Sequence, residues 1–370
     1  MKIAWVTVRN WDDFCSTTTD ALAKGLVDRG HNLTIFNSDL SDTHQHRPWS
    51  HVVLSQSTVP GRKAASLARS ACKWFRQNTT KEFDVIVVDW PLAIPLAQSI
   101  YDQGCCVVLM DRSPPADTNI LAKLQWRVWK KAWSLVRKGI IQQGFVVSKA
   151  HQEFVIQRCN IEEQQLHTLP AGVNIQRFQL NQQPFDGIWR FVYHGRLDKH
   201  RGVLALPMLI RKLNNRGIKS NLSLVGEGDA FTSLQAIAAH ETRVSVSPRM
   251  SQDAIAQHLM TQHIGLLPMP DTPVWSIASP LKRSEYLAAG LMVYGIDHAG
   301  HRIASADDSW FKLAAKEDFH EDACNWMAEL SEETWRIGSQ SARDYAIKNC
   351  SWDHSVESME SVLQSCISDE

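Results

Sequence analysis

Short apolar runs alternate with helical patterns almost throughout this chain. Residues 3–8, 85–88 and 106–110 are such runs, and residues 18–29 and 62–77 carry helical spacing between them. Apolar runs separated by helices are typical of parallel strands that are buried on both faces of a sheet. The pattern therefore predicts an α/β fold built from doubly wound sheets.

The alternation runs through the chain twice. The stretch 180–187 between the two series is polar and rich in turn residues, as domain boundaries are. We expect an amino-terminal Rossmann-like domain at 1–180, a second one at 188–350, and a last helix at 351–370 that packs back on the first domain. Two such domains face each other across a cleft at the carboxyl ends of their strands, where ligands bind.

Composition excludes some classes of protein. Lys and Arg equal Asp and Glu at 39 each, whereas a general nucleic-acid binder should carry a net positive charge. The eight cysteines are scattered without metal-binding spacing, which favours free thiols in a reducing compartment. The first residues are typical of a strand and not of a signal peptide, and no apolar run could span a bilayer. We expect a cytoplasmic protein.

A predicted strand at 191–193 leads directly into two arginines. Gly195 allows a tight turn, and Arg196 and Arg201 follow it five residues apart. Guanidinium groups offer forked, charge-assisted hydrogen bonds that suit a diphosphate. The alternative is that both arginines pair with acids on the surface.

A second group of polar residues begins a helix. Ser279 is a good N-cap and Pro280 fits the first helical position. The free N–H groups of the helix and the charge of Lys282 would suit a phosphate. Glu285, one turn further on, could accept hydrogen bonds from ribose hydroxyls, or it is an ordinary solvated glutamate.

A third stretch ends a predicted strand in a turn that holds Gly226, Glu227 and Gly228. Glycines at this place would allow a ligand to approach the backbone, although an ordinary strand-to-helix turn would use them too. The rest of the G-x-G-x-x-G pattern is missing, which argues against a dehydrogenase.

Taken together, these pieces resemble the carboxyl-terminal domain of GT-B glycosyltransferases, and most closely the retaining enzymes of family 4. The stretches that carry the resemblance are Gly195-Arg196-Leu197, Arg201-Gly202, Val225-Gly226-Glu227-Gly228, Glu285-Tyr-Leu-Ala-Ala-Gly290 and Leu169-Pro-Ala-Gly-Val-Asn-Ile-Gln-Arg-Phe178. They cover most of residues 145–295.

The resemblance implies a retaining, hexosyltransferase-type enzyme in glycan biosynthesis. It would move a sugar from a nucleoside diphosphate sugar to a glycan or lipid-linked acceptor, without a metal or other cofactor. Arg196, Arg201 and Lys282 would stabilise the leaving diphosphate, and Glu285 would bind the donor ribose. The other donor-side residues that it implies are Gly195, Gly226, Glu227, Gly228, Arg249, Met250, Ser279, Pro280 and Leu281.

Two positions depart from the family pattern. Arg201 replaces the usual lysine, and Ile277 stands where many relatives carry a glutamate that handles the sugar. The sugar is therefore left open. Alternatives are a sugar-nucleotide epimerase, an inverting GT-B transferase and a non-catalytic GT-B-like binding subunit.

The amino-terminal half should hold the acceptor. Its first loop, at 9–15, has no glycine and begins with Arg9. Asp89 and Asp111 end predicted strands and could steer an acceptor hydroxyl, or they cap helices. His194 is a further candidate at the end of its strand, or a buried structural histidine.

A predicted helix at 119–143 carries Trp126, Trp129 and Trp133 on one stripe. The adjoining face is basic and holds Lys123, Arg127, Lys130, Lys131, Arg137 and Lys138. Such a helix can lie on an anionic membrane, which would place the protein at the inner face of the membrane. Alternatively, the tryptophans pack on the core and the basic face is solvated.

Overall fold

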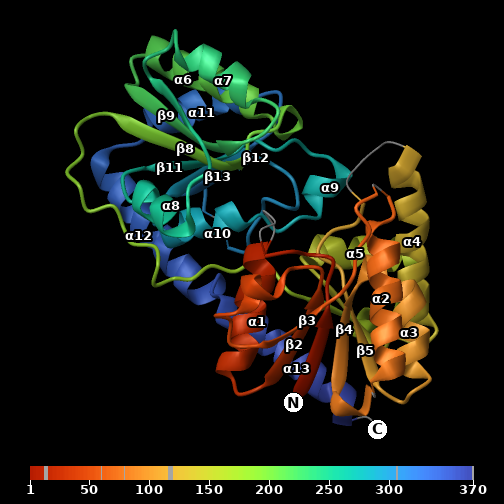
Figure 1. The fold of residues 1–370 in the computed structure, drawn as a ribbon. Helices are drawn as coiled ribbons and strands as arrows, with labels where there is room; N and C mark the ends of the chain where they lie inside the picture. The colour runs from red at the N-terminus through yellow and green to blue at the C-terminus, as the bar shows by residue number, and fades with distance from the viewer. Residues whose placement is uncertain (12–15, 60, 79, 116–119, 306, 369–370) are drawn as a thin grey trace. The chain divides into compact units, whose positions relative to one another are not determined.

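The computed structural model describes residues 1–11, 16–59, 61–78, 80–115, 120–305 and 307–368. The chain divides into two compact units (Figure 1): the first is Met1–Pro170 with Trp352–Glu370, and the second is Ala171–Ser351. The second unit begins before the predicted boundary at 180–187, because Val173 and Phe178 are buried in its core.

The first unit contains a parallel seven-stranded sheet in the order β3-β2-β1-β4-β5-β6-β7. Helices cover both faces: α2 to α5 lie on one, and α1 and α13 on the other. The strands are β1 (Lys2–Val6), β2 (Asn32–Asn37), β3 (Ser50–Val53), β4 (Val85–Asp89), β5 (Cys106–Met110), β6 (Gln143–Val146) and β7 (Leu166–Thr168). The helices are α1 (Ser16–Asp28), α2 (Lys63–Gln77), α3 (Ala93–Tyr101), α4 (Ile120–Arg137), α5 (Lys149–Cys159) and α13 (Trp352–Ser368).

The second unit contains a parallel six-stranded sheet in the order β10-β9-β8-β11-β12-β13. Its strands are β8 (Trp189–Arg196), β9 (Ser220–Glu227), β10 (Val244–Ser247), β11 (Ile264–Leu267), β12 (Met292–Ile296) and β13 (Phe311–Ala314). Its helices are α6 (Leu206–Asn215), α7 (Phe231–Ala238), α8 (Gln252–Leu259), α9 (Pro273–Ser276), α10 (Leu281–Ala288), α11 (Phe319–Ala328) and α12 (Glu332–Asn349).

These two sheets confirm the predicted doubly wound α/β fold. In the second sheet the chain proceeds outward in one direction from β8 and in the other from β11. Open sheets of this kind bind ligands at the carboxyl ends of the strands where the order reverses. The end of β8, which carries Arg196, is therefore where a ligand is expected.

The helix predicted at 119–143 is shorter in the structure. Asn119 lies outside the described residues, and α4 ends at Arg137. Gly139 has a φ of 71°, and the N–H groups of Ile140 and Ile141 bond back to the carbonyl of Leu135. A left-handed glycine with such backward bonds ends a helix, so the chain can turn into β6 at Gln143.

The tryptophan stripe of α4 packs on the core. Trp129 and Trp133 are fully buried, and Trp126 packs against the same cluster. The basic residues of the adjoining face are exposed. Among the described residues, no helix is both long and apolar enough to cross a bilayer. The seven cysteines in the described part are free thiols, and Cys15 lies outside it.

Candidate active site

The end of β8 brings two arginines to one carboxylate. Arg196 is the last residue of β8, and Arg201 ends the 3₁₀ turn Lys199–Arg201. Nη2 and Nε of Arg196 donate to the two oxygens of Asp198 at 3.0 and 3.2 Å. Nε of Arg201 lies 3.4 Å from Oδ2 of the same residue. The acid that pairs with both arginines is thus a buried residue of the turn itself.

Lys282 adds a third cation beside the arginines. It is buried in the first turn of α10, with its Nζ 5.0 Å from the centroid of the Tyr193 ring. The Tyr193 hydroxyl donates to the Arg196 carbonyl at 2.9 Å and receives a hydrogen bond from Arg201. Nζ of Lys282 also stands 3.5 Å from where a Cβ would lie at Gly195. Tyr193 therefore contacts the lysine, the backbone of Arg196 and the side chain of Arg201.

Burial shifts the pKa values of the ionisable groups in this cluster, and it brings two of them close to neutrality. Burial, assisted by the charge of Arg201, lowers the pKa of Lys282 to about 7. Burial raises the pKa of Glu285 to about 7, although Lys282 opposes the shift. His194, whose Nε2 lies 3.2 Å from Oε2 of Glu285, is neutral because burial lowers its pKa to about 3. Ionisable groups shifted in this way are characteristic of functional sites.

The glycines of this region serve contacts between the two turns. A Cβ at Gly226, where φ is 148°, would lie 1.8 Å from the carbonyl oxygen of Gly195. A Cβ at Gly228, where φ is 158°, would lie 2.5 Å from Oδ1 of Asp198 and from the Leu197 backbone. The structure shows that the ends of β8 and β9 require these glycines, which agrees with the alternative of an ordinary strand-to-helix turn; the approach of a ligand to them stays a prediction.

The prediction that Ser279 caps the following helix is wrong. The N-cap residue of α10 is Pro280, so that Leu281 is the first helical residue. The Ser279 hydroxyl accepts from the N–H of Ala171 at 3.0 Å, and the Ser284 hydroxyl donates to the Ala171 carbonyl at 3.0 Å. The polar residues at this helix end therefore secure the first residue of the second unit.

The other donor-side candidates differ in exposure. Glu227 is half exposed, with Oε1 3.8 Å from Nη1 of Arg196. Arg249 is exposed, and Met250 packs partly against the core. Ile277 is buried. Glu227 thus lies beside the arginine cluster.

Two members of the cluster were missed by the sequence interpretation. Asp198 joins the arginines, and the ring of Trp275 lies under the guanidinium of Arg201 with its centroid 4.4 Å from Cζ. The spacing Arg196-x-Asp198-x-x-Arg201 was a usable signal for Asp198. No local signal existed for Trp275, because it lies more than seventy residues away in the chain.

The acceptor-side aspartates are buried and bonded. Asp89 accepts from the Trp5 indole at 3.2 Å, the Thr7 hydroxyl at 2.6 Å and the Val8 N–H at 3.1 Å. Burial nevertheless raises its pKa. Its side chain caps no helix. Its hydrogen bonds instead hold the end of β4 against the segment that follows β1. Arg9 follows that segment and is half buried, and residues 12–15 of its loop lie outside the described part.

Asp111 is a structural residue at the end of β5. Its side chain is fully buried, and Oδ2 accepts from the indoles of Trp129 and Trp133 at 2.6 and 3.0 Å. Nε2 of His151 lies 3.5 Å from the same oxygen. Because Oδ2 holds both tryptophans of α4 against the sheet, Asp111 neither caps a helix nor reaches an acceptor.

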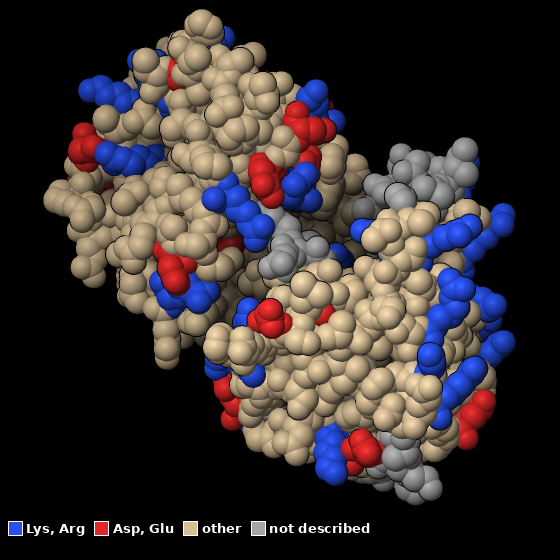
Figure 2. Space-filling view, viewed as in Figure 1, with Lys and Arg blue, Asp and Glu red and all other residues tan. Residues whose placement is uncertain are grey.

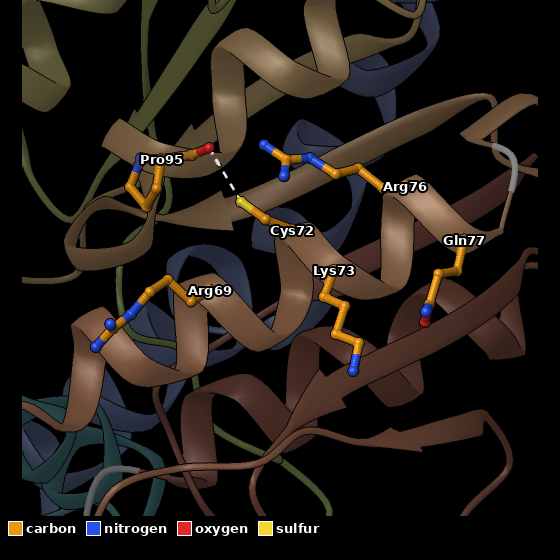
Figure 3. A pocket seen from close by; sticks show the side chains of 6 residues that line it. All are labelled: Arg69, Cys72, Lys73, Arg76, Gln77 and Pro95. Atoms are coloured by element: carbon orange, nitrogen blue, oxygen red, sulfur yellow. Dashed lines mark hydrogen bonds between the residues drawn. The ribbon is translucent and has the colours of Figure 1, made fainter.

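A pocket of about 550 Å³ lies on the first unit, between α2 and the start of α3 (Figure 3). Its walls are Arg69, Cys72, Lys73, Arg76, Gln77 and Pro95. The Cys72 thiol donates to the carbonyl of Pro95 at 3.0 Å, which closes the floor between the two helices. This pocket is separate from the arginine cluster, and three of its six walls are cationic.

The chain is similar in fold to solved glycosyltransferase structures over its whole length. A glycosyltransferase from Rickettsia africae shares 12% identity at a TM-score of 0.77, covering 100% of this chain and 99% of that one. Sucrose-phosphate synthase from Thermosynechococcus elongatus shares 16% at 0.79, covering 100% of both. HepE from Anabaena, solved with UDP-glucose, shares 15% at 0.74, covering 99% and 100%.

A family model matches part of the amino-terminal half of the chain. Residues 16–177 match the model described as Glycosyltransferase Family 4. No curated protein matches the chain at a significant level. The chain therefore has the two-domain GT-B fold, and its match to the family model is limited to residues 16–177.

Proposed function

We propose that this chain is a glycosyltransferase that takes its sugar from a nucleoside diphosphate sugar. The observation that carries the proposal is the cluster of Arg196, Arg201 and Lys282 at the switch point of the second sheet. Three cations around one strand end suit a diphosphate; the ring of Trp275 lies against Arg201, and the ring of the buried Tyr193 lies against Lys282.

The cations would act on the leaving group. As the bond between the sugar carbon and the diphosphate breaks, negative charge builds on the phosphate oxygens, and preorganised donors lower the barrier most when they meet such charge. In the retaining reaction that we propose, the acceptor oxygen bonds to the same face of the sugar carbon. The acceptor proton passes to the departing phosphate. Hexosyl transfer without a metal ion is the expected form of this reaction.

Uridine is the first base to test in the donor. HepE, which shares this fold, was solved in complex with UDP and with UDP-glucose. Glu285 is placed one turn after Lys282 on α10, where its carboxylate could accept from the ribose hydroxyls. The acceptor that we propose is a glycan or a lipid-linked saccharide bound by the first unit.

The test is binding followed by product analysis. Isothermal calorimetry of the purified chain against UDP, GDP and ADP should identify one nucleotide that binds. Sugars linked to that nucleotide should then raise the melting temperature of the protein. NMR of the product should then show the donor's anomeric configuration. An inverted anomer would identify an inverting transferase, and an isomerised donor sugar an epimerase. Binding without turnover would favour a non-catalytic subunit, and lack of binding would contradict the proposal.

We further propose that the first unit associates peripherally with an anionic membrane on the cytoplasmic side. The neighbouring helices α2, α3 and α4 contain no acidic residue. Figure 2 shows Lys and Arg side chains gathered along the face that carries α2 and α4. The exposed cations of α4 are Lys123, Arg127, Lys130, Lys131 and Arg137, and those of α2 include Arg69, Lys73 and Arg76 of the pocket.

The buried tryptophans change how this helix could bind lipid. Because the Trp stripe of α4 faces the core, adhesion would depend on charge, which weakens with salt. Flotation with vesicles containing phosphatidylglycerol should recover the protein at low ionic strength and release it at high ionic strength. Vesicles of phosphatidylcholine alone are the control, and equal recovery from both would contradict the proposal.

A further inference from the structure

Asp198 contacts both arginines of the cluster, and the edge of each guanidinium that it contacts decides which N–H groups stay available to a phosphate. It binds Arg196 side-on, through Nε and Nη2, at 3.2 and 3.0 Å. Its Oδ2 lies 3.4 Å from Nε of Arg201. A carboxylate that occupied the ends of the guanidinium groups would exclude a phosphate. This carboxylate instead uses the Nε edge of each guanidinium, and Nη1 of Arg196 takes no part in its contact with Asp198.

Asp198 is itself held in place by the turn after β9. Its Oδ1 lies 3.4 Å from the N–H of Asp229, and Oδ1 of Asp229 accepts from the N–H of Lys199 at 2.7 Å. The side chain of Asp198 is only 11% exposed. Gly228 allows this packing, since a Cβ there would lie 2.5 Å from Oδ1 of Asp198. The carboxylate is thus a fixed point from which both arginines are oriented.

Asp198 remains charged at neutral pH. Burial alone would raise its pKa, but the hydrogen bonds and charges of Arg196 and Arg201 hold the pKa below its ordinary value. The same contact raises the pKa of Arg196. Arg201 has two further partners, the Trp275 ring and the Tyr193 hydroxyl, whereas Arg196 has Asp198 and the distant Glu227. Arg196 therefore depends more on Asp198 for its orientation.

We propose that Asp198 is a positioning residue, which holds Arg196 and Arg201 by their Nε edges so that their other N–H groups face a bound diphosphate. This inference rests on the proposed function, because it presupposes that the cluster binds a diphosphate. It predicts that Asp198 contributes to diphosphate affinity although its own charge repels a diphosphate. A purely competing carboxylate would have the opposite effect.

The test uses Asp198→Asn, which keeps the shape and removes the charge. Inorganic pyrophosphate is the probe, because it reports on the arginines independently of the base. Calorimetry should show that Asp198→Asn weakens pyrophosphate binding by about tenfold, the scale of one charge-assisted hydrogen bond. The matched control is Asp308→Asn, which removes an exposed carboxylate that pairs with Lys312 and not with an arginine of the cluster. Its affinity should stay within about twofold of the wild type.

A double-mutant cycle separates orientation from simple turn stability. If Asp198 acts through Arg196 and Arg201, the double variant Asp198→Asn/Arg196→Ala should lose less affinity for pyrophosphate than the sum of the two single losses, because only Arg201 is left to be positioned. Additive losses, or an Asp198→Asn variant that binds as tightly as the wild type or more tightly, would overturn the inference. Absence of pyrophosphate binding by the wild type would overturn the donor-site proposal itself, and this inference with it.

Discussion

The buried lysine of the cluster predicts how donor binding depends on pH. Burial and the charge of Arg201 lower the pKa of Lys282 to about 7. The ammonium is therefore present below that pH and is lost as the pH rises. If Lys282 binds the diphosphate, affinity should fall on the alkaline side of neutrality, where an ordinary lysine would stay charged.

The size of the effect follows from the titration. Above the pKa, each pH unit reduces the charged form about tenfold, and the loss stops when the whole contribution of the ammonium has gone. A hydrogen bond to a charged group contributes about 1.5–3 kcal/mol, or roughly 10- to 150-fold in affinity. Between about pH 7 and about pH 9 we therefore expect UDP affinity to fall by one to two orders of magnitude.

Unfolding would not account for such a loss. The folded-state pKa of Lys282 is about 7, below its ordinary value of 10.5. Between these two values the unfolded chain binds the additional proton, so the contribution of this residue to stability grows with pH. Glu285, with a pKa raised to about 7, becomes negative in the same range; its charge then repels the diphosphate, while its oxygens become better acceptors for the ribose hydroxyls.

The assay is calorimetric titration of UDP at several pH values, with the wild type beside Lys282→Arg. Arginine stays charged throughout this range, so the variant should lose much of the pH dependence. The residual slope should disappear in Lys282→Arg/Glu285→Gln. An identical slope in the wild type and in Lys282→Arg would refute the assignment of Lys282 to the diphosphate.

Three further predictions concern stability and turnover. In urea titrations, Gly226→Ala should lower the free energy of unfolding by about 3 kcal/mol or more, because the new Cβ would clash with a backbone oxygen. The control Gly217→Ala, at a φ of 82° with no atom within 4 Å of the new Cβ, should lower it by only about 1 kcal/mol. Equal losses in the two variants would contradict the packing argument. Asp111→Ala should destabilise the first unit by about 2–6 kcal/mol, since two buried indole N–H groups lose their acceptor, and a change below about 1 kcal/mol in the same titration would refute the role. Arg196→Ala should cut turnover roughly 10²–10³-fold in a sugar-transfer assay, while the exposed Arg211→Ala should retain activity; wild-type turnover in Arg196→Ala would contradict the proposed role.

Much of the fold could be predicted from local patterns. The apolar runs at 85–88 and 106–110 are strands in the structure, because a strand buried on both faces must be apolar along its whole length. β13 was missed, since Phe311–Ala314 carries only a short apolar signal. The end of α4 was also missed, because the bond from Ile140 to Leu135 that closes the helix depends on Gly139 leaving the helical conformation.

The candidate site was predictable in part. Arg196, Arg201, Lys282 and Glu285 were found because their types and spacing suggest phosphate chemistry. Their partners could not be found in this way, since Tyr193 and Trp275 act through ring contacts that form only when β8 and the segment before α10 come together. Ser279 looked like a cap in isolation, yet its hydroxyl is used by Ala171.

The sequence by itself determined the class of fold and the residues that could carry charge to a diphosphate, because apolar periodicity and side-chain type are local properties. Only the tertiary structure decided which charges are buried, which carboxylate orients which guanidinium, and which face of α4 meets the core. Burial depends on residues that are distant in the chain. It shifts the pKa values of Lys282 and Glu285 to about 7. It also places the Asp111 carboxylate, which the sequence offered as a contact for the acceptor, where it accepts hydrogen bonds from two tryptophans.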